Sequence, residues 1–483
     1  MSNLAVTKPA NIIRLIFGVA WLYLFILGLH AYQGNGIVYI VFSTTFLLML
    51  VSAFYGRRTY VYTYLVVFFW LGFWLKVTYH LVFPYPYVEP TGRFVSSAAS
   101  WNKVLLVSTV ACVGTLVSRL IFQVVPGGQC STGDNGKNIP HWLQSSANWQ
   151  LLLFILAVLI TSVANIYFGI FVIGFDVRTI LAWPLNALIT LMLVGGGFVV
   201  WASSILWWRS NSGRPLFAYL VTLVVLGEIM TSLALSRGLI VFFVLPLLYA
   251  LYENRQKIAD YSAPKTILIG LFFLFFVIVN FFVVNEIRDN VYFSRNDQHI
   301  QHQAEPQLPI SEKIRSFLNF SVDRWVGIEG VMAVSSYSKT GSELFLRALY
   351  EKPGNGRLTI YQTICPWPSS PEFSSLKKDV RLFSLPGGVA FLYYSNSIVV
   401  VFVFTVLISF FLQYAESLIF SFVGNPILCS GVGWLMAITF AQFGGVPRTL
   451  VPVIIFLLFS ILFVGVIQAR RTEGLWRKIA LSF

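Results

Sequence analysis

Charged side chains are scarce in this sequence. Asp, Glu, Lys and Arg make up 11% of its 483 residues, whereas a soluble chain carries roughly 25% because its surface must be wet. Hydrophobic residues account for 57% and aromatic residues for 17%. Most of the molecular surface therefore faces something other than water, which excludes an ordinary soluble globular protein.

Cysteine and histidine are also few. The four cysteines have no paired or metal-like spacing, so the sequence predicts neither a disulfide framework nor a zinc site. Of the five histidines, His299 and His302 lie close together in a polar loop, where two histidines are more often solvated than metal-bound. We therefore expect no metal ion and no other cofactor.

Apolar runs of about 20 residues are abundant, and this is the length that a helix needs to cross a hydrocarbon core of roughly 30 Å. They predict twelve spans, near 12–31, 36–55, 59–82, 104–123, 149–168, 183–207, 216–235, 239–252, 264–284, 393–413, 426–443 and 450–468. The expected fold is an all-α polytopic membrane protein. Transmembrane helices 1–9 fall in 1–284, a large helical loop or lid in 285–390, and helices 10–12 with a tail in 391–483.

Lysine and arginine are distributed unevenly between the short loops, and this asymmetry predicts the orientation. With the amino terminus in the cytoplasm, the short outer loops hold five basic residues: Arg93, Lys103, Arg178, Arg237 and Arg448. The inside segments then hold fifteen: Lys8, Arg14, Arg57, Arg58, Arg119, Lys137, Arg209, Arg214, Arg255, Lys257, Lys265, Arg470, Arg471, Arg477 and Lys478. Both termini are therefore expected inside and the large loop outside. The net charge of +14 is a topological signal and does not indicate nucleic-acid binding.

Basic residues on the outer side run against this pattern and require an explanation. An ionisable residue at membrane depth costs roughly 2.5–3.5 kcal/mol, so it usually faces a polar cavity or a partner. For any single basic residue of this set, a side chain that extends to the lipid headgroups or forms a structural ion pair is as good an explanation as a functional role. Together they predict a cationic pocket for phosphate or pyrophosphate, because guanidinium groups bind phosphate in a bidentate manner. The members of this set are Arg178, Arg237, Arg288, Arg324, Arg448 and Lys76, which lies one turn before His80.

Acidic candidates cluster in the large loop, on a helix expected to begin near Pro309. Asp323 and Glu329 flank Arg324, and on a continuous helix Trp325 and Glu329 would share one face. A carboxylate beside an indole suits a sugar, which stacks on the ring while its hydroxyl group is bonded or deprotonated. A surface helix with an intrahelical ion pair is an equally good explanation of each residue alone. Glu228, in the seventh span, is expected to be a structural hydrogen-bonding group or a partner of Lys76.

Three segments carry a resemblance to a known family. They are Ser236-Arg237-Gly238 at the end of a span, Asp323 to Gly330 in the large loop, and Leu385-Pro386-Gly387-Gly388 leading into Tyr393-Tyr394. With the architecture of most of the chain, they resemble bacterial oligosaccharide repeat-unit polymerases. These are the Wzy-type O-antigen and capsule polymerases, which are related to the O-antigen ligases.

The resemblance implies a metal-independent glycosyltransferase of the bacterial inner membrane, active on its periplasmic face. Its substrates would be undecaprenyl-pyrophosphate-linked repeat units, with undecaprenyl pyrophosphate as the leaving group, and a chain-length regulator is left open as a partner. We expect the six basic residues above to bind pyrophosphate, and Trp325 and Tyr393 to bind sugar. Glu329 is the first candidate for the base, before Asp323 and His299.

Other functions remain as alternatives. An O-antigen ligase, which moves finished polysaccharide onto lipid A core, needs the same leaving-group pocket. A transporter or flippase for a lipid-linked sugar would place charged residues through mid-membrane depth and show repeat symmetry, and neither is visible in the sequence. A structural or regulatory membrane protein would not require the clustered arginines.

Overall fold

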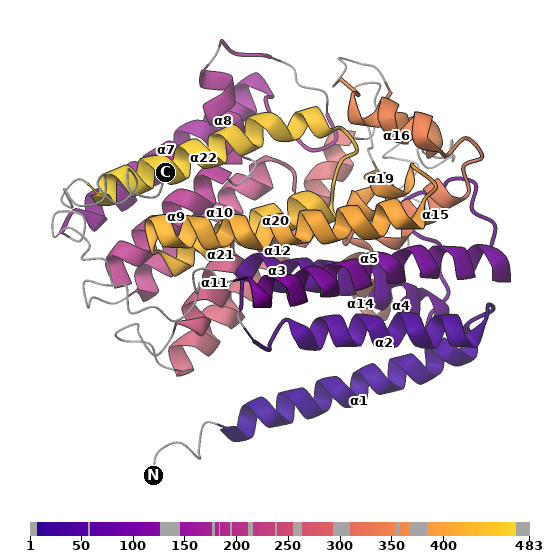
Figure 1. The fold of residues 1–483 in the computed structure, drawn as a ribbon. Coiled ribbons are helices and arrows are strands. Elements are labelled where there is room, and N and C mark those ends of the chain that lie inside the picture. Colours follow the sequence, from indigo (N-terminus) through magenta and orange to yellow (C-terminus); the bar gives the residue numbers. More distant parts are fainter. Residues whose placement is uncertain are drawn as a thin grey trace.

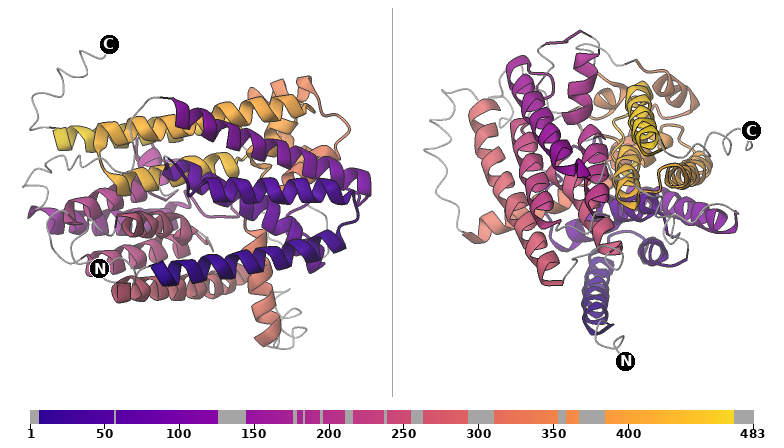
Figure 2. Two further views of the ribbon diagram at one scale, coloured as in Figure 1. Left: turned by 60° about the horizontal axis from the view of Figure 1, so that its bottom comes forward. Right: turned by 90° about the vertical axis from the view of Figure 1, so that its left-hand side faces the viewer.

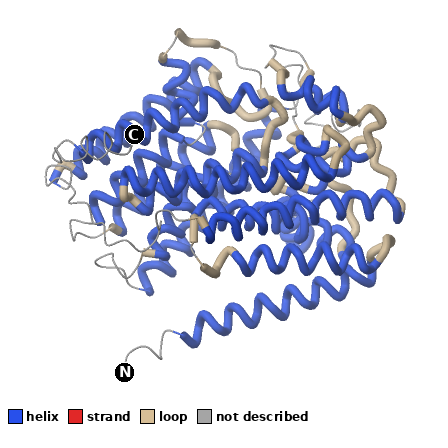
Figure 3. Tube along the Cα trace, in the orientation of Figure 1, coloured by secondary structure: helices blue, strands red, loops and turns tan. Residues whose placement is uncertain are grey.

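The structure is a computed structural model that describes residues 7–56, 58–125, 145–175, 179–182, 184–193, 196–210, 216–236, 239–254, 263–292, 310–352, 358–366 and 384–469. Within these ranges the regular structure is helical and contains no β-strand (Figure 3). The all-α prediction is therefore confirmed. The second view of Figure 2 looks along the long helices and shows that they form a bundle.

The first part of the bundle precedes the large loop. It consists of α1 (Thr7–Ala31), α2 (Gly36–Ser52), α3 (Tyr60–Phe69), the π-helix η1 (Trp70–Leu75), α4 (Lys76–Val82), α5 (Ala98–Val124), α7 (Ala147–Phe168), α8 (Leu185–Leu193), α9 (Gly196–Ser210), α10 (Phe217–Leu233), α11 (Leu239–Glu253) and α12 (Ala263–Tyr292). The elements α3, η1 and α4 follow one another without a break, and we call them the third helix.

The region between α12 and α20 corresponds to the predicted lid, and we call it the insert. Its helices are α14 (Ile310–Asp323), α15 (Ile328–Ser335), α16 (Ser342–Leu349), α17 (Ile360–Ile364) and α19 (Gly387–Tyr393). The chain then continues through α20 (Ile398–Val423), α21 (Pro426–Ala441), the 3₁₀ turn η2 (Pro447–Thr449) and α22 (Leu450–Ala469). The helix α14 runs crosswise to the long helices in the first view of Figure 2.

Five helices in the described ranges are long and apolar enough to cross a membrane, namely Tyr60–Val82, Ala98–Val124, Ala147–Phe168, Leu268–Arg288 and Ile398–Val423. Six further apolar helices are shorter, at 10–17 residues. The sixth predicted span is divided between α8 and α9, and the tenth begins later and extends further than expected. The membrane character is thus supported, and the total of twelve spans stays a prediction.

The outer surface of the bundle suits a hydrocarbon environment. On α7, Leu153, Ile160 and Val163 are 55%, 66% and 64% exposed, an arrangement that would be unfavourable in water but is favourable against lipid tails. The interior lies mainly between α5 and α20, between α3 and α21, and between α2 and α5. In Figure 1, the insert lies at the right-hand end of this bundle, which we call the insert end.

Both described chain ends lie at the opposite end of the bundle. In Figure 1, α1 begins and α22 ends on the left, away from the insert. The described start of α1 and the described end of α22 thus lie at the same end of the bundle. The side of the membrane that each end faces stays a prediction.

A buried carboxylate fixes the start of the third helix at that opposite end. Glu416 of α20 is fully buried, and its two oxygens accept hydrogen bonds from the backbone N–H groups of Tyr60 (2.8 Å) and Val61 (2.6 Å). The first N–H groups of a helix lack intrahelical acceptors and favour negative charge. Thr59, at the N-cap position, makes no capping bond through its side chain. A residue more than 350 positions away therefore caps this helix.

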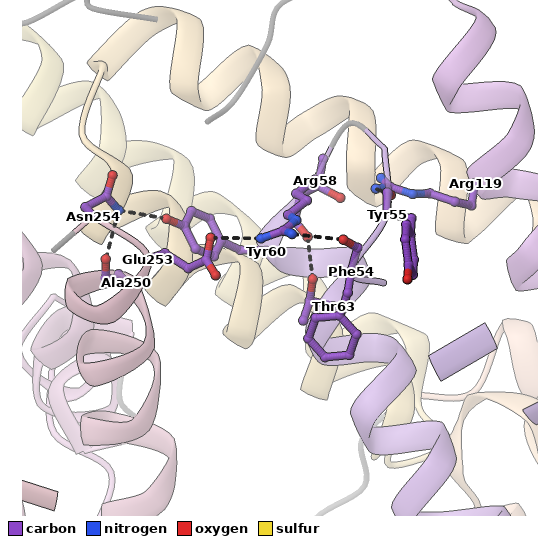
Figure 4. A network of polar contacts seen from close by, with 10 residues as sticks. Phe54, Tyr55, Arg58, Tyr60, Thr63, Arg119, Ala250, Glu253 and Asn254 are labelled. Atoms are coloured by element: carbon purple, nitrogen blue, oxygen red, sulfur yellow. Dashed lines mark hydrogen bonds and ion pairs between the residues drawn. The ribbon is translucent and has the colours of Figure 1, made fainter. Parts of the chain in front are cut away.

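A second set of polar contacts surrounds the same helix start (Figure 4). Arg58 lies 3.4 Å from Glu253 of α11, and Asn254 donates a hydrogen bond to the Tyr60 hydroxyl group at 3.1 Å. Arg119 of α5 donates to the Tyr55 carbonyl oxygen at 3.2 Å. The start of the third helix and the loop before it are thus connected to α5, α11 and α20.

Candidate functional site

Close contact between two glycines joins the insert to the third helix. Gly72 lies in η1, and Gly327 lies between α14 and α15. A Cβ atom on Gly327 would lie 2.2 Å from the Gly72 carbonyl oxygen, and one on Gly72 would lie 2.5 Å from the Val326 carbonyl oxygen. Neither position has space for a side chain, because the obstructing atoms are backbone. Glycine at both positions allows the two backbones to touch.

This contact corrects the expectation of one continuous helix through Glu329. The helix α14 ends at Asp323 and α15 begins at Ile328, so Trp325 and Glu329 do not share a helix face. The break is explained by Gly327, whose extended backbone packs on Gly72. Trp325 packs instead on Phe68 of α3, with ring centroids 5.7 Å apart.

Lys76 and Glu329 form a buried ion pair just beyond the glycine contact. The Lys76 side chain is 0% exposed and that of Glu329 is 3% exposed. The Lys76 ammonium group donates to Glu329 Oε1 and, at 3.1 Å, to the Asp323 carbonyl oxygen. Of the two roles expected for Glu228, the pairing with Lys76 is therefore wrong, and the structural hydrogen bond is confirmed. Glu228 instead accepts a hydrogen bond from Ser232 on its own helix, at 3.1 Å.

His80 lies one turn further along α4 and completes a second pair with the insert. Its Nδ1–H group donates to the Tyr85 carbonyl oxygen at 3.1 Å, and its Nε2 atom lies 2.8 Å from Asp323 Oδ1. Both partners are acceptors, so the ring carries two protons or Asp323 carries one. The ring is stacked between Tyr85 and Tyr87, at centroid distances of 4.1 Å and 3.8 Å.

Three carboxyl groups at this place each have an oxygen without a hydrogen-bond donor among the described residues. They are Asp323 Oδ2, Glu329 Oε2 and Glu89 Oε2, and all three atoms are buried. A buried acceptor without a donor costs about 1–3 kcal/mol, and more when it is charged. Each of these oxygens is therefore suited to a bound proton or to a hydroxyl group supplied by a ligand.

Glu89 is the one of the three that sequence reasoning missed. It lies in the loop Phe83–Ser97 between α4 and α5. Burial raises the pKa of Glu89 to about 7, the Glu329 carboxylate adds to the rise, and the Lys76 ammonium group opposes it. Because the loop is rich in proline and tyrosine and has no periodicity, the available signal was one carboxylate among Pro86, Tyr87 and Pro90.

Two of the predicted pyrophosphate-binding arginines are brought near each other. Burial lowers the pKa of Arg324, and the positive charge of Arg288 lowers it further, while Glu89 opposes the change. Arg288, at the end of α12, also donates from Nε to the Leu235 carbonyl oxygen at 2.9 Å. The two guanidinium groups and the three carboxyl groups thus belong to one electrostatic environment.

The remaining predicted residues lie elsewhere or outside the described ranges. Arg448 is exposed in η2. Tyr393 is buried in α19, with the Lys103 ammonium group 5.7 Å from the centre of its ring. Arg178, Arg237 and His299 lie outside the described residues. The structure therefore brings together Lys76, Arg288, Arg324, Asp323 and Glu329.

An apolar cavity of about 200 Å³ lies beside the carbonyl group that Arg288 binds. It is lined by Ile166, Gly169, Val172, Phe175, Leu233, Leu235 and Val291. Pockets that enclose small molecules usually measure roughly 300–1,000 Å³. This cavity is too small to be a complete binding site for such a ligand.

Metal-binding side chains are not clustered in the described part of the chain, where no three His, Cys, Asp or Glu residues are arranged to hold an ion. Comparison with family models, with curated proteins and with solved structures finds no match to this chain. The candidate site is therefore the group formed by Lys76, His80, Glu89, Arg288, Asp323, Arg324 and Glu329, which we call the charged cluster.

Proposed function

We propose that this protein is a membrane glycosyltransferase that polymerises undecaprenyl-pyrophosphate-linked oligosaccharide repeat units on the periplasmic face of the bacterial inner membrane. One observation carries the proposal. Three carboxyl groups, each with a buried oxygen that accepts no hydrogen bond from the described residues, lie in one electrostatic environment with Arg288 and Arg324. This environment lies at the end of the bundle that the insert covers.

The carboxyl groups suit the acceptor sugar. A hydroxyl group donates a hydrogen bond to a carboxylate, and a carboxylate near it can accept its proton as the new bond forms. Asp323 Oδ2 and Glu329 Oε2 are available to accept hydrogen bonds from the acceptor sugar, while their other oxygens are held by His80 and Lys76. The ion pairs thereby fix the direction in which the free oxygens point.

The arginines suit the donor. Negative charge accumulates on the pyrophosphate as its bond to the sugar breaks, and cationic groups already in place stabilise that charge without reorganising. Arg288 and Arg324 supply two such groups, and Arg237, which follows Ser236 in the chain, is proposed as a third. The lipid-borne donor would reach the site from the bilayer. The exposed apolar faces of the helices are the surfaces that contact that bilayer.

The proposal is tested with purified protein in detergent, lipid-linked repeat units and no other enzyme. We expect ladders of longer glycans on the lipid carrier. Intact substrate across a range of pH and detergents would refute polymerisation. Transfer to lipid A core, in place of a second lipid-linked unit, would identify a ligase instead.

A substitution of Arg237 tests the proposed pyrophosphate site separately. Replacing Arg237 by alanine should abolish chain extension, because a cation at the leaving group is lost. Arg347→Ala is a matched control, since Arg347 is an exposed arginine of α16. Undiminished ladders from the Arg237 variant would remove that residue from the proposed site.

A further inference from the structure

The loop that carries Glu89 is fixed to the protein on both sides of that residue. Before it, the Tyr85 carbonyl oxygen accepts the hydrogen bond from His80. After it, the Pro90 carbonyl oxygen lies 3.0 Å from the Cys365 thiol group, which donates to it. Gly92 follows and packs on α15, where a Cβ atom would lie 3.1 Å from the Ala333 Cα atom. The position of the Glu89 carboxyl group is therefore determined by the fold.

Glu89 also differs from the other two carboxyl groups of the charged cluster. Glu329 is paired with Lys76, and Asp323 is paired with His80. In each of these two groups one oxygen is occupied by that partner, so only the other oxygen can accept a hydrogen bond or a proton from a ligand. No ion pair joins Glu89 to a residue in the described ranges, and its Oε2 atom accepts no hydrogen bond from them.

We propose that Glu89 is the catalytic base of the glycosyl transfer. This inference rests on the proposed function. The Glu89 carboxylate accepts the proton of the acceptor hydroxyl group, and the acceptor oxygen forms a bond to the anomeric carbon of the donor sugar. The bond between that carbon and the pyrophosphate oxygen breaks, and its electron pair leaves with the lipid pyrophosphate. Glu329 Oε2 and Asp323 Oδ2 then hold the acceptor sugar by hydrogen bonds, while their other oxygens stay paired with Lys76 and His80.

The proton affinity of Glu89 suits this role. A general base works best when its pKa lies near the working pH, and burial raises the pKa of Glu89 to about 7. The titratable groups that interact with it come from four neighbouring elements. They are Lys76 of α4, Asp323 and Arg324 at the end of α14, Glu329 of α15, and Tyr361 and Cys365 at α17.

The test is the pH dependence of the initial rate of chain extension between pH 5.5 and 9. For the unaltered protein we expect the rate to rise with pH, with a midpoint near 7, as Glu89 loses its proton. Glu89→Gln should lower the rate by about 10²–10⁴-fold and remove the rise near pH 7. Glu89→Asp, which keeps the acid but shortens its reach, should lower the rate and keep a pH-dependent rise.

Two comparisons make the result decisive. Glu343→Gln, at an exposed carboxylate of α16, should change neither rate nor profile. A Glu89→Gln protein that keeps both the rate and the midpoint would overturn the inference, as would a Glu329→Gln protein that alone loses the rise near pH 7. An unaltered protein that makes no product at any pH would instead refute the proposed function, and the role of Glu89 with it. Melting temperatures of all variants identify any loss of fold.

Discussion

Lys76 and Glu329 occupy positions at which an isolated charge would be unstable. Taking an ion from water into a protein interior costs several kcal/mol, and the partner charge recovers this only when the geometry is good. Here Lys76 also donates to the Asp323 carbonyl oxygen, so the ammonium group has two acceptors on the insert. The pair therefore attaches the insert to the third helix as well as satisfying both charges.

The first prediction concerns this pair. Lys76→Met or Glu329→Gln alone should destabilise the protein by about 3–5 kcal/mol, because each leaves buried polar groups unpaired. The double variant should lose clearly less than the sum. Unfolding in mixed micelles gives the three free energies needed for a double-mutant cycle. Additive losses would show that the two side chains do not stabilise each other.

The second prediction concerns the pH dependence of stability at Glu89. Its pKa rises from 4.5 to about 7 in the folded protein, so the folded state binds the proton more tightly than the unfolded state. Proton binding therefore contributes to the free energy of unfolding. This contribution is fully present below pH 4.5 and is lost as the pH rises through 7. Glu89→Gln should remove this loss, which amounts to at most about 3 kcal/mol. The free energy of unfolding of both proteins is measured at pH 5 and pH 8. An equal change between the two pH values for the unaltered and the Glu89→Gln proteins would contradict the prediction.

At the scale of the element, the insert depends on backbone contact more than on side-chain packing at the place where it meets the third helix. Gly72 and Gly327 approach too closely for any Cβ atom. A similar contact occurs at Gly330, where a Cβ atom would lie 1.9 Å from the Pro386 carbonyl oxygen. The two glycine-containing segments noticed in the sequence, Asp323–Gly330 and Leu385–Gly388, therefore pack on each other.

The third prediction tests that contact. Gly327→Ala should separate the insert from the third helix and destabilise the protein by about 1–3 kcal/mol or more, as overpacking does. It should also reduce chain extension, because Glu329 and Asp323 move with the insert. Gly18→Ala is the matched control, since no atom lies within 4 Å of a Cβ atom placed there. Equal melting temperatures for both variants would show that the glycine contact is not required.

Hydropathy predicted the elements better than the contacts between them. The bounds of α7 and the third helix follow from apolar runs, and the turn between Lys76 and His80 follows from helical spacing. The helix α5 begins at Ala98, before the predicted span 104–123. The break at residues 324–327 could not be predicted, because it depends on Gly72, which is about 250 positions away. Glu89 was missed for the same reason: its burial is produced by elements that are distant in the sequence. The presence of Gly72 and Gly327 in the sequence does not by itself predict that their backbones are in contact.

At the scale of the whole molecule, the two ends of the bundle differ in the contacts that hold the third helix. Glu416 and the contacts around Arg58 hold the third helix at one end, and the charged cluster holds it at the other. The described ends of α1 and α22 lie together, away from the insert (Figure 1). This arrangement suits a protein that receives its substrate at one membrane face.

The fourth prediction tests the orientation with single cysteines in a cysteine-free background. Ser338→Cys in the insert should react with a membrane-impermeant maleimide when that reagent reaches only the periplasm, because Ser338 is exposed. Tyr55→Cys, which is exposed at the opposite end, should react only after the inner membrane is opened. The reverse pattern would invert the proposed topology.

The π-helix in the third helix has a consequence for the register of that helix. A π-turn accommodates one residue more than an α-turn, and one residue corresponds to a rotation of about 100° in an α-helix. Deleting one residue within Trp70–Leu75 would therefore restore a regular α-helix and leave Lys76 and His80 facing the insert, because the wider π-turn already absorbs the rotation of the extra residue. Converting the π-turn to an α-turn with no deletion would instead turn both charged side chains by about 100° and away from the insert.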